Sequence, residues 1–278
     1  IIPPDIALCE DCYREFSDPS DRRHHYPFIN CTNCGPRYTI TETIPYDRPK
    51  TSMKVFPMCN TCQDEYDNPE DRRFHAQPNA CPVCGPSVTL HDNFGKPFKC
   101  VDPIVTAVNL IQDKKVLGIR GLGGFHLTVN GYSKKAVDLL RTRKGRPAKP
   151  LAVMVPDIQT IKGFAELSTQ QEELLQSPQH PIVLLQKSKF YNLAENLAPG
   201  VHEIGVMLAY TPLHHLLFCQ DHCPDVLVMT SGNISSVPIC ISNDDAVQKL
   251  QHITDGFLFH NREIITRVDD SVTRVLNN

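Results

Sequence analysis

The hydrophobic pattern of the chain changes at about residue 101. Before this point, apolar residues are scattered among charged residues and cysteines, and long apolar periods are few. After it, short runs of Val, Ile, Leu and Met alternate with segments whose apolar residues recur every three to four positions. Such runs are typical of buried strands, and the longer period is typical of amphipathic helices. The pattern therefore predicts a small first domain, residues 1–100, and a second domain, residues 101–278.

The second domain is predicted to alternate strands with helices. The stretch "DPIVTAVNLIQDKK" (102–115) predicts a helix with Asp102 as its N-cap and Pro103 at its first position. The expected strands are 116–120, 150–155, 181–186, 204–208, 226–230 and 256–260. The other expected helices are 133–143, 157–164, 168–176, 212–220 and 243–252. Near-continuous apolar strands between helices indicate an α/β fold in which helices cover the sheet.

The first domain, called here the cysteine-rich segment, contains one unit written twice, at residues 9–37 and 59–87. Each unit has two CxxC pairs with eighteen residues between them, and each keeps an acidic residue, two arginines and a histidine in "DRRHH" or "DRRFH". Four such thiolates suit a tetrahedral zinc ion and leave no position open to water or substrate. We therefore expect two structural zinc ions, held by Cys9, Cys12, Cys31 and Cys34 and by Cys59, Cys62, Cys81 and Cys84.

Several alternatives for these units stay open. Disulfides are the first, although CxxC pairs in a cytoplasmic chain favour metal. Spacing alone does not decide whether the pairs combine locally or in an interleaved way, the first with the fourth. His25 and His75 are candidate ligands, but packing or a hydrogen bond to a thiolate explains their repetition as well. The Gly-Pro step after each second pair, at Gly35 and Gly85, suggests a positive φ.

Composition and charge narrow the class of protein. The chain is 41% apolar and 21% charged, as in ordinary soluble globular proteins. Its apolar runs are too short to cross a bilayer and no basic-then-apolar leader opens it, so we expect a cytoplasmic protein without membrane contact. Residues 1–100 contain eleven Lys and Arg against fourteen Asp and Glu. This balance argues against nucleic acid as a partner, because phosphate binding usually needs a basic excess.

Three loops of the second domain contain residues that suit ligand binding. The first is glycine-rich, Gly121 to His126. The second places Lys144 and Arg146 two positions apart beside a strand, where both cations can reach a polyphosphate. The third, "TSGNIS" (230–235), puts hydroxyl and amide groups at the end of an apolar strand. If the three loops converge, they form a nucleotide pocket, whereas Lys134 and Lys135 are expected on a solvated helix face.

The combination of motifs resembles a known family. The tandem "CxxC…CxxCGP" units followed by "RGLGGFHL", "LRTRKGRPAKPLAVM", "TSGNIS" and "RVDDSVTR" resemble the middle of the hydrogenase-maturation carbamoyltransferases. Residues 101–278 alone resemble the YrdC-like domain, which forms an acyl adenylate from ATP. The resemblance implies a YrdC-like twisted sheet covered by helices. It also implies that an acylphosphatase domain and a sugar-kinase-fold transferase domain adjoin this stretch in the full protein.

The resemblance implies an ATP-dependent enzyme that releases AMP and pyrophosphate. Carbamate derived from carbamoyl phosphate would attack ATP to give carbamoyl adenylate. The adjoining transferase domain would then carbamoylate the terminal cysteine of an acceptor protein, a step toward the cyanide ligands of nickel–iron hydrogenase. The segment "RGLG" stands where threonine-using relatives have "PTxT", which argues against threonine as the co-substrate.

The resemblance also implies site residues. Lys144 and Arg146 would be catalytic and, with Ser231 and Asn233, would hold the triphosphate. The residues expected near the carbamoyl end are Arg120, Gly123, Gly124 and His126, with a packed strand residue as the alternative for His126. The last motif contributes Arg267, Asp269, Asp270 and Ser271. Asp269 or Asp270 is expected to contact magnesium, and the alternative is that the two aspartates accept hydrogen bonds from Arg267 and Arg274.

A different class of function is also compatible with the sequence. Zinc units of this kind occur in modules that bind RNA or dock partner proteins, and such a module would have no adenylation activity. The cysteine-rich segment carries no basic excess, which weighs against RNA. A dependence of ATP turnover on the loop at Lys144 would distinguish the enzyme from the binding module.

Overall fold

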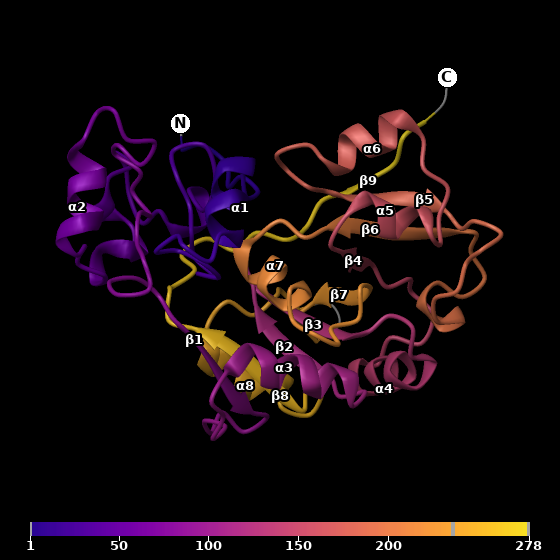
Figure 1. The fold of residues 1–278 in the computed structure, drawn as a ribbon. Coiled ribbons are helices and arrows are strands. Elements are labelled where there is room, and N and C mark those ends of the chain that lie inside the picture. Colours follow the sequence, from indigo (N-terminus) through magenta and orange to yellow (C-terminus); the bar gives the residue numbers. More distant parts are fainter. Residues whose placement is uncertain (1, 235–236, 277–278) are drawn as a thin grey trace.

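A computed structural model describes residues 2–234 and 237–276 of the chain (Figure 1). Ser235, the last residue of the "TSGNIS" motif, lies outside the described residues. Within the described ranges, nine strands form one mixed sheet in the order β1-β8-β2-β3-β7-β4-β6-β5-β9. The strands are β1 (Val88–Asp92), β2 (Leu117–Arg120), β3 (Phe125–Asn130), β4 (Val153–Val155), β5 (Ile182–Gln186), β6 (Glu203–Leu208), β7 (Leu227–Ser231), β8 (Gly256–His260) and β9 (Val272–Thr273).

Helices and the cysteine-rich segment cover the two faces of this sheet. The helices are α1 (Glu10–Ser17), α2 (Asn60–Asp67), α3 (Pro103–Gln112), α4 (Lys134–Lys144), α5 (Ile158–Lys162), α6 (Thr169–Leu175), α7 (Pro212–Phe218) and α8 (Asn243–Leu250). Short 3-10 turns occupy Tyr38–Ile40, Arg48–Lys50, Ser52–Val55 and Glu195–Leu197. Among the described residues, none of these helices is long and apolar enough to span a membrane.

Alternate side chains of the central strands point to opposite faces, as the two-residue period of a strand requires. In β7, Val228 belongs to the core that α4, α5, α6 and α8 cover. Its neighbours Leu227 and Met229 belong to a second core, on the other face. The second core contains residues of α3 and α7 together with Phe16, Phe28 and Ile29 of the cysteine-rich segment. Burial on both faces explains why these strands read as continuous apolar runs.

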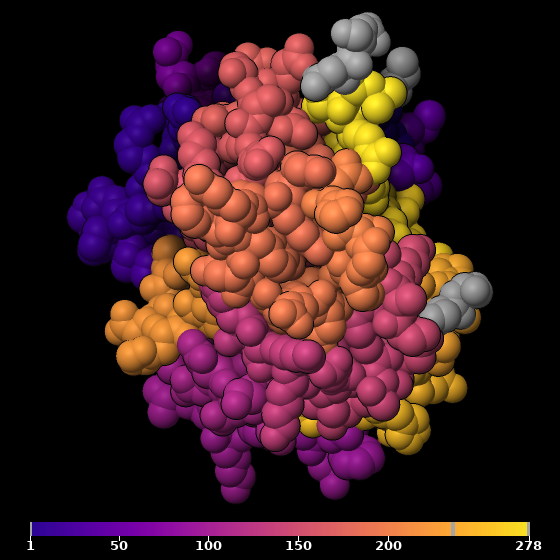
Figure 2. All heavy atoms as spheres, turned by 90° about the vertical axis from the view of Figure 1, so that its right-hand side faces the viewer, coloured from indigo at the N-terminus to yellow at the C-terminus, as the bar shows by residue number. Residues whose placement is uncertain are grey.

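The cysteine-rich segment is therefore joined to the sheet by a shared core. It also donates a strand, because β1 pairs with β8 although it lies before residue 100. Backbone hydrogen bonds add to the contact, from Leu8 N to Tyr210 O at 2.9 Å and from Ile265 N to Thr39 O at 2.8 Å. The division of the chain at residue 100 into separately folding domains stays a prediction. From the side opposite this segment, residues of the middle and end of the chain form most of the surface (Figure 2).

The sequence located most of the elements and missed three strands. Every expected strand and helix of the second domain has a counterpart in the structure, and Asp102 caps α3 by accepting hydrogen bonds from the N–H groups of Ile104 and Val105. The strands β1, β3 and β9 were not expected. The glycine-rich turn is shorter than predicted, because β3 begins at Phe125. The helix predicted over 133–143 extends to Lys144, and Gly145, with a φ of 63°, ends it.

Candidate functional site

The eight cysteines of the repeats gather into two sets of four, one in each unit. In both units the first cysteine, Cys9 or Cys59, precedes the helix as its N-cap, and the helix carries the second cysteine into the cluster. The recorded Sγ–Sγ separations are 3.7 and 3.9 Å in the first set and 3.6 to 3.8 Å in the second. A tetrahedron with Zn–S bonds of about 2.3 Å has edges of about 3.8 Å. Each set therefore fits one zinc ion.

This geometry decides between the alternatives for the repeats. The pairing is local, so the interleaved arrangement is wrong, and all eight cysteines are free thiols, so the disulfide alternative is wrong as well. His25 packs on the rings of His24 and Phe16, and His75 packs on Tyr66. Neither histidine belongs to a cysteine set. A positive φ is found at Gly35 but not at Gly85, where an added Cβ would lie 2.1 Å from the Tyr26 hydroxyl oxygen.

A second cluster forms where the end of α4 meets the end of β7. The Lys144 ammonium donates to the Asn233 side-chain oxygen at 2.9 Å and to the Asn233 carbonyl at 3.0 Å, and it also contacts the Ser231 carbonyl. The Ser231 hydroxyl donates to the same Asn233 oxygen at 2.8 Å. These contacts bring the second and third predicted loops together, as expected.

Arg146 lies on the same cluster and influences its electrostatics. Its guanidinium donates to the Thr230 hydroxyl at 3.1 Å and to the Pro150 carbonyl at 2.8 Å. Burial and the neighbouring Arg146 charge lower the pKa of Lys144 to about 8, against a smaller opposing effect of Asp269. A bound polyanion would relieve the repulsion between the two cations, so the pair is suited to phosphate groups.

The first predicted loop reaches the same cluster through β3. In the antiparallel pairing of β3 with β7, His126 lies directly opposite Ser231. The ring of His126 is buried and contacts Asp270 at 2.8 Å, and Tyr210 donates to the other Asp270 oxygen at 3.1 Å. Burial lowers the pKa of His126, but the Asp270 carboxylate outweighs it and the net shift is upward. Conversely, burial raises the pKa of Asp270, and His126 with Tyr210 brings it below the ordinary value.

A cavity of about 400 Å³ opens beside this histidine–aspartate pair. Its polar wall includes Gly123, Asp269, Asp270 and Ser271. Both carboxylate oxygens of Asp270 already accept hydrogen bonds, whereas the recorded contact of Asp269 is from the backbone N–H of Asp270 at 3.1 Å. Asp269 is therefore the carboxylate with more capacity for a cation.

The remaining predicted site residues mainly hold the backbone of the site. Arg120 is buried and donates to the Asn243 side-chain oxygen and to the carbonyls of His260 and Ile241. Gly124 packs against Ile239, which leaves no room for a Cβ. Arg267 donates to the Ile239 carbonyl, and Arg274 pairs with Glu203. Arg267 and Arg274 thus have partners other than Asp269 and Asp270. Direct contacts of Arg120 and Arg267 with a ligand stay predictions.

Sequence reasoning assigned no role to four residues that contact these sites. Thr230 and Tyr210 contact predicted site residues, and both stand at the ends of apolar strands where polar residues signal a site. The arginines of the repeated "DRR" motif were noticed but given no role. Arg22 donates to Cys62 Sγ at 3.0 Å, and Arg72 donates to Cys12 Sγ at 3.2 Å.

Two family models match the chain. One, the HypF finger, matches residues 8–41 and 58–91. The other, Sua5_yciO_yrdC, which carries the description "Telomere recombination", matches residues 109–278. The first covers both cysteine units, and the second covers most of the sheet and the polar loops.

The relatives of the chain include carbamoyltransferases. The carbamoyltransferase HypF of Synechocystis sp. is 53% identical over 99% of this chain and 36% of its own length. A crystal structure of full-length HypF in the phosphate- and nucleotide-bound form is 50% identical, with a TM-score of 0.93 over 98% of this chain and 35% of that one. The crystal structure of T. kodakarensis HypF is 48% identical, with a TM-score of 0.96 over 99% and 36%.

The chain thus spans about a third of the length of these relatives. The match over residues 109–278 covers more than half of the chain and includes β3, α4 and β7, which carry the polar cluster. The chain therefore belongs to the Sua5/YciO/YrdC family, and its tandem HypF fingers and its similarity along nearly its whole length relate it to the HypF carbamoyltransferases.

Proposed function

We propose that this chain forms carbamoyl adenylate from ATP and carbamate, as the activating step of a carbamoyltransferase. A carboxylate oxygen of carbamate attacks the α-phosphorus of ATP. The new bond joins this oxygen to the α-phosphorus, and the bond between the α-phosphorus and the β-bridging oxygen breaks. Pyrophosphate leaves with the electron pair of that bond. The electrons balance without any oxidant or reductant.

The observation that carries the proposal is the cluster of Lys144, Arg146, Ser231 and Asn233. Two cations and a hydroxyl gather where the end of α4 meets the end of β7, held by hydrogen bonds. Negative charge accumulates on the leaving pyrophosphate, and preorganised cations stabilise such charge without reorganising. The nucleotide-bound state of a solved relative that is 50% identical supports ATP as the ligand.

The neighbouring cavity suits the other reactant and a metal. Carbamate is small and planar, and the turn before β3 and Asp270, which pairs with His126, border a space of about 400 Å³. Magnesium prefers carboxylate oxygens and phosphate oxygens together. We propose Asp269 as its protein ligand, because both Asp270 oxygens accept hydrogen bonds from His126 and Tyr210.

The reaction is tested by isotope exchange between pyrophosphate and ATP with carbamoyl phosphate as the carbamate source. An added acylphosphatase domain would release carbamate if the free acid proves too short-lived. We expect AMP and pyrophosphate as products. Replacing Lys144 or Arg146 by Ala should lower the rate by about 10²–10³, because each removes a cation that stabilises the leaving group.

Matched controls separate this role from a general effect of charge. Lys134 is exposed on the same helix, about 3.8 Å from Glu195, and Lys134→Ala should leave the rate unchanged. Ser231→Ala should cost less than Lys144→Ala, because a hydroxyl is a neutral donor. ADP as the sole product, or equal rates for the Lys144 and Lys134 variants, would contradict adenylation and favour a binding module.

The wider role extends to the full protein. We propose that adjoining acylphosphatase and sugar-kinase-fold domains supply carbamate and use the adenylate, since the chain spans about a third of its relatives. The acceptor would be a terminal cysteine on a partner protein, as a precursor of the cyanide ligands of nickel–iron hydrogenase. Mass spectrometry of an acceptor peptide incubated with the full protein tests this transfer.

A further inference from the structure

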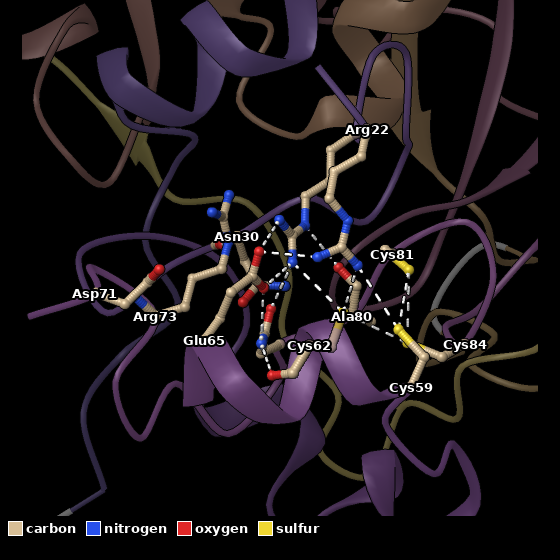
Figure 3. A network of polar contacts seen from close by, with 12 residues as sticks. Arg22, Asn30, Cys59, Cys62, Glu65, Asp71, Arg73, Ala80, Cys81 and Cys84 are labelled. Carbon is tan, nitrogen blue, oxygen red and sulfur yellow. Dashed lines mark hydrogen bonds and ion pairs between the residues drawn. The ribbon is translucent and has the colours of Figure 1, made fainter. Parts of the chain in front are cut away.

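The two cysteine units exchange arginine side chains. Arg22 of the first unit donates to Cys62 Sγ of the second unit at 3.0 Å. Arg72, fifty positions later, donates to Cys12 Sγ of the first unit at 3.2 Å. Figure 3 shows Arg22 beside the sulfur atoms of the second unit. Each thiolate set is thus contacted by an arginine of the other repeat.

The next arginine of each motif follows the same exchange. Arg23 pairs with Glu65 on α2 at 2.5 Å, and its Nε donates to the Ala80 carbonyl at 2.9 Å. Arg73 pairs with Glu15 on α1, and its Nε donates to the Asn30 carbonyl at 3.1 Å. Each donor and acceptor in the contacts of Arg22 and Arg23 has its counterpart fifty positions away in the contacts of Arg72 and Arg73. The repeats are therefore arranged as two mutually dependent halves.

The exchanged arginines bring positive charge to sites that would be negatively charged with zinc bound. A zinc ion with four thiolates carries a net charge of about −2, because four negative sulfurs outweigh one divalent cation. Cys12 and Cys62 are fully buried, so water cannot solvate their sulfur atoms. Groups that hydrogen-bond to metal ligands orient them and contribute to metal affinity. Here the contacting guanidinium comes from the other unit in both cases.

We propose that the two zinc sites form one coupled metal centre, in which the exchanged arginines complete each site from the opposite repeat. When one site loses its metal, its unit no longer holds its own arginines in place, and the other site loses its donor. Coupling of this kind is reciprocal, so each ion should raise the affinity for the other by the same factor. This inference does not depend on the proposed adenylation.

The first test counts zinc ions on the zinc-loaded 278-residue chain by native mass spectrometry during titration with a chelator. Coupled sites should yield mainly chains with two ions or none. Independent equal sites would yield about half of the chains with a single ion at the midpoint, which would overturn the proposal.

The second test asks which cysteines respond to loss of one arginine. Arg72→Gln should weaken the first site, so that a thiol-alkylating reagent modifies Cys9, Cys12, Cys31 and Cys34 first, and the second set follows once the first zinc ion is lost. Arg22→Gln should expose the second set instead. The expected loss of zinc affinity is about 10–100-fold at the opposite site. Arg14→Gln is the control, since Arg14 pairs with Asp11 on the surface.

Misfolding would look different from this result. A variant that fails to fold should expose both cysteine sets together, and Arg72→Lys then replaces it, because lysine keeps the charge but loses the planar fork. We expect Arg72→Lys to weaken the same first site by a smaller factor. The proposal would be overturned if Arg72→Gln exposed only the cysteines of the second unit, to which Arg72 belongs. It would also be overturned if its cysteines were alkylated at the same rates as those of Arg14→Gln.

Discussion

The cysteine-rich segment and the sheet differ in how much of their interior is apolar. The segment buries four arginines: Arg23, Arg37, Arg48 and Arg73. They donate mainly to backbone carbonyls and glutamates, as Arg48 does to the carbonyls of Gln77, Asn79 and Phe56. The sheet region also buries cations, such as Arg120 and Arg141, but it fills most of its interior with Val, Leu, Ile and Phe against its helices.

The difference follows from how the backbone N–H and C=O groups of each region find hydrogen-bond partners. Strands and helices pair their own N–H and C=O groups, so the space between them can be filled with apolar side chains. The irregular loops of the cysteine units leave carbonyls without such partners, and arginine offers five donors in a fixed fork to pair them. The segment thus relies on charged hydrogen bonds and on two cysteine sets that fit zinc, in addition to its share of the second core, and the sheet relies mainly on apolar burial.

Metal removal should give the largest difference in stability between the two regions. Structural zinc contributes about 10 kcal/mol or more per site, as much as the whole stability of a typical domain. With a strong chelator, we expect rapid hydrogen exchange over residues 9–91 and weaker protection of α7, which shares a core with the segment. On the opposite face of the sheet, α4 should stay protected. Equal loss of protection in α4 would show that the regions unfold as one unit.

Removing a buried arginine should have the next largest effect. Arg23→Met removes one of the two arginines that pair with Glu65, leaving Arg22, and it takes the donor away from the Asn79 side-chain oxygen and the Ala80 carbonyl. We expect a loss of about 4 kcal/mol in the free energy of unfolding. Urea denaturation of the zinc-loaded chain measures it. Arg14→Met, in an exposed pair, should cost less than about 0.5 kcal/mol. Similar values for both variants would argue against charged hydrogen bonds as the main support of the segment.

A cavity in the sheet core should cost somewhat less. Leu127 in β3 is fully buried between the sheet and its helices, and Leu127→Ala should lower the free energy of unfolding by about 3 kcal/mol. The zinc content should stay at two, because the cysteine units belong to the other face of the sheet. The exposed Val101 provides the control, with an expected change within about 0.5 kcal/mol for Val101→Ala. Loss of zinc from the Leu127 variant would show that the two regions depend on each other.

The smallest expected effect concerns Lys144, a buried cation of the second domain. The pKa of Lys144 is lowered to about 8, first by burial and then by Arg146. The ammonium is charged below this pH and neutral above it, so ATP affinity should fall as the pH rises through about 8, by at most about tenfold per unit. Calorimetry at pH 7 and pH 9 measures this change. Lys144→Arg stays charged and should show a weaker pH dependence, whereas equal dependence in both proteins would exclude Lys144 as the titrating group.

The sequence predicted the features that depend on local spacing. A CxxC turn brings two thiolates together whatever surrounds it, and both cysteine sets were found as predicted. Asp102 before Pro103 predicts a helix start for equally local reasons. The strand β1 is not evident from the sequence because its five residues, "VTLHD", include one buried side chain, and its role depends on its partner β8.

What the sequence alone determined is thus the kind of chemistry: eight thiolates in two sets, and cationic and hydroxyl residues in the loops that follow α4 and β7. Only the tertiary structure decided which groups meet. The contact of His126 with Asp270 joins residues 144 positions apart, and Arg22 contacts Cys62 across forty positions. Spacing determines contacts within a turn or a helix, but the partner of a distant side chain depends on how all the elements pack. The exchange of arginines between the two repeats is an example. Each "DRR" motif could contact the cysteines of its own unit or those of the other unit, and the sequence does not tell which.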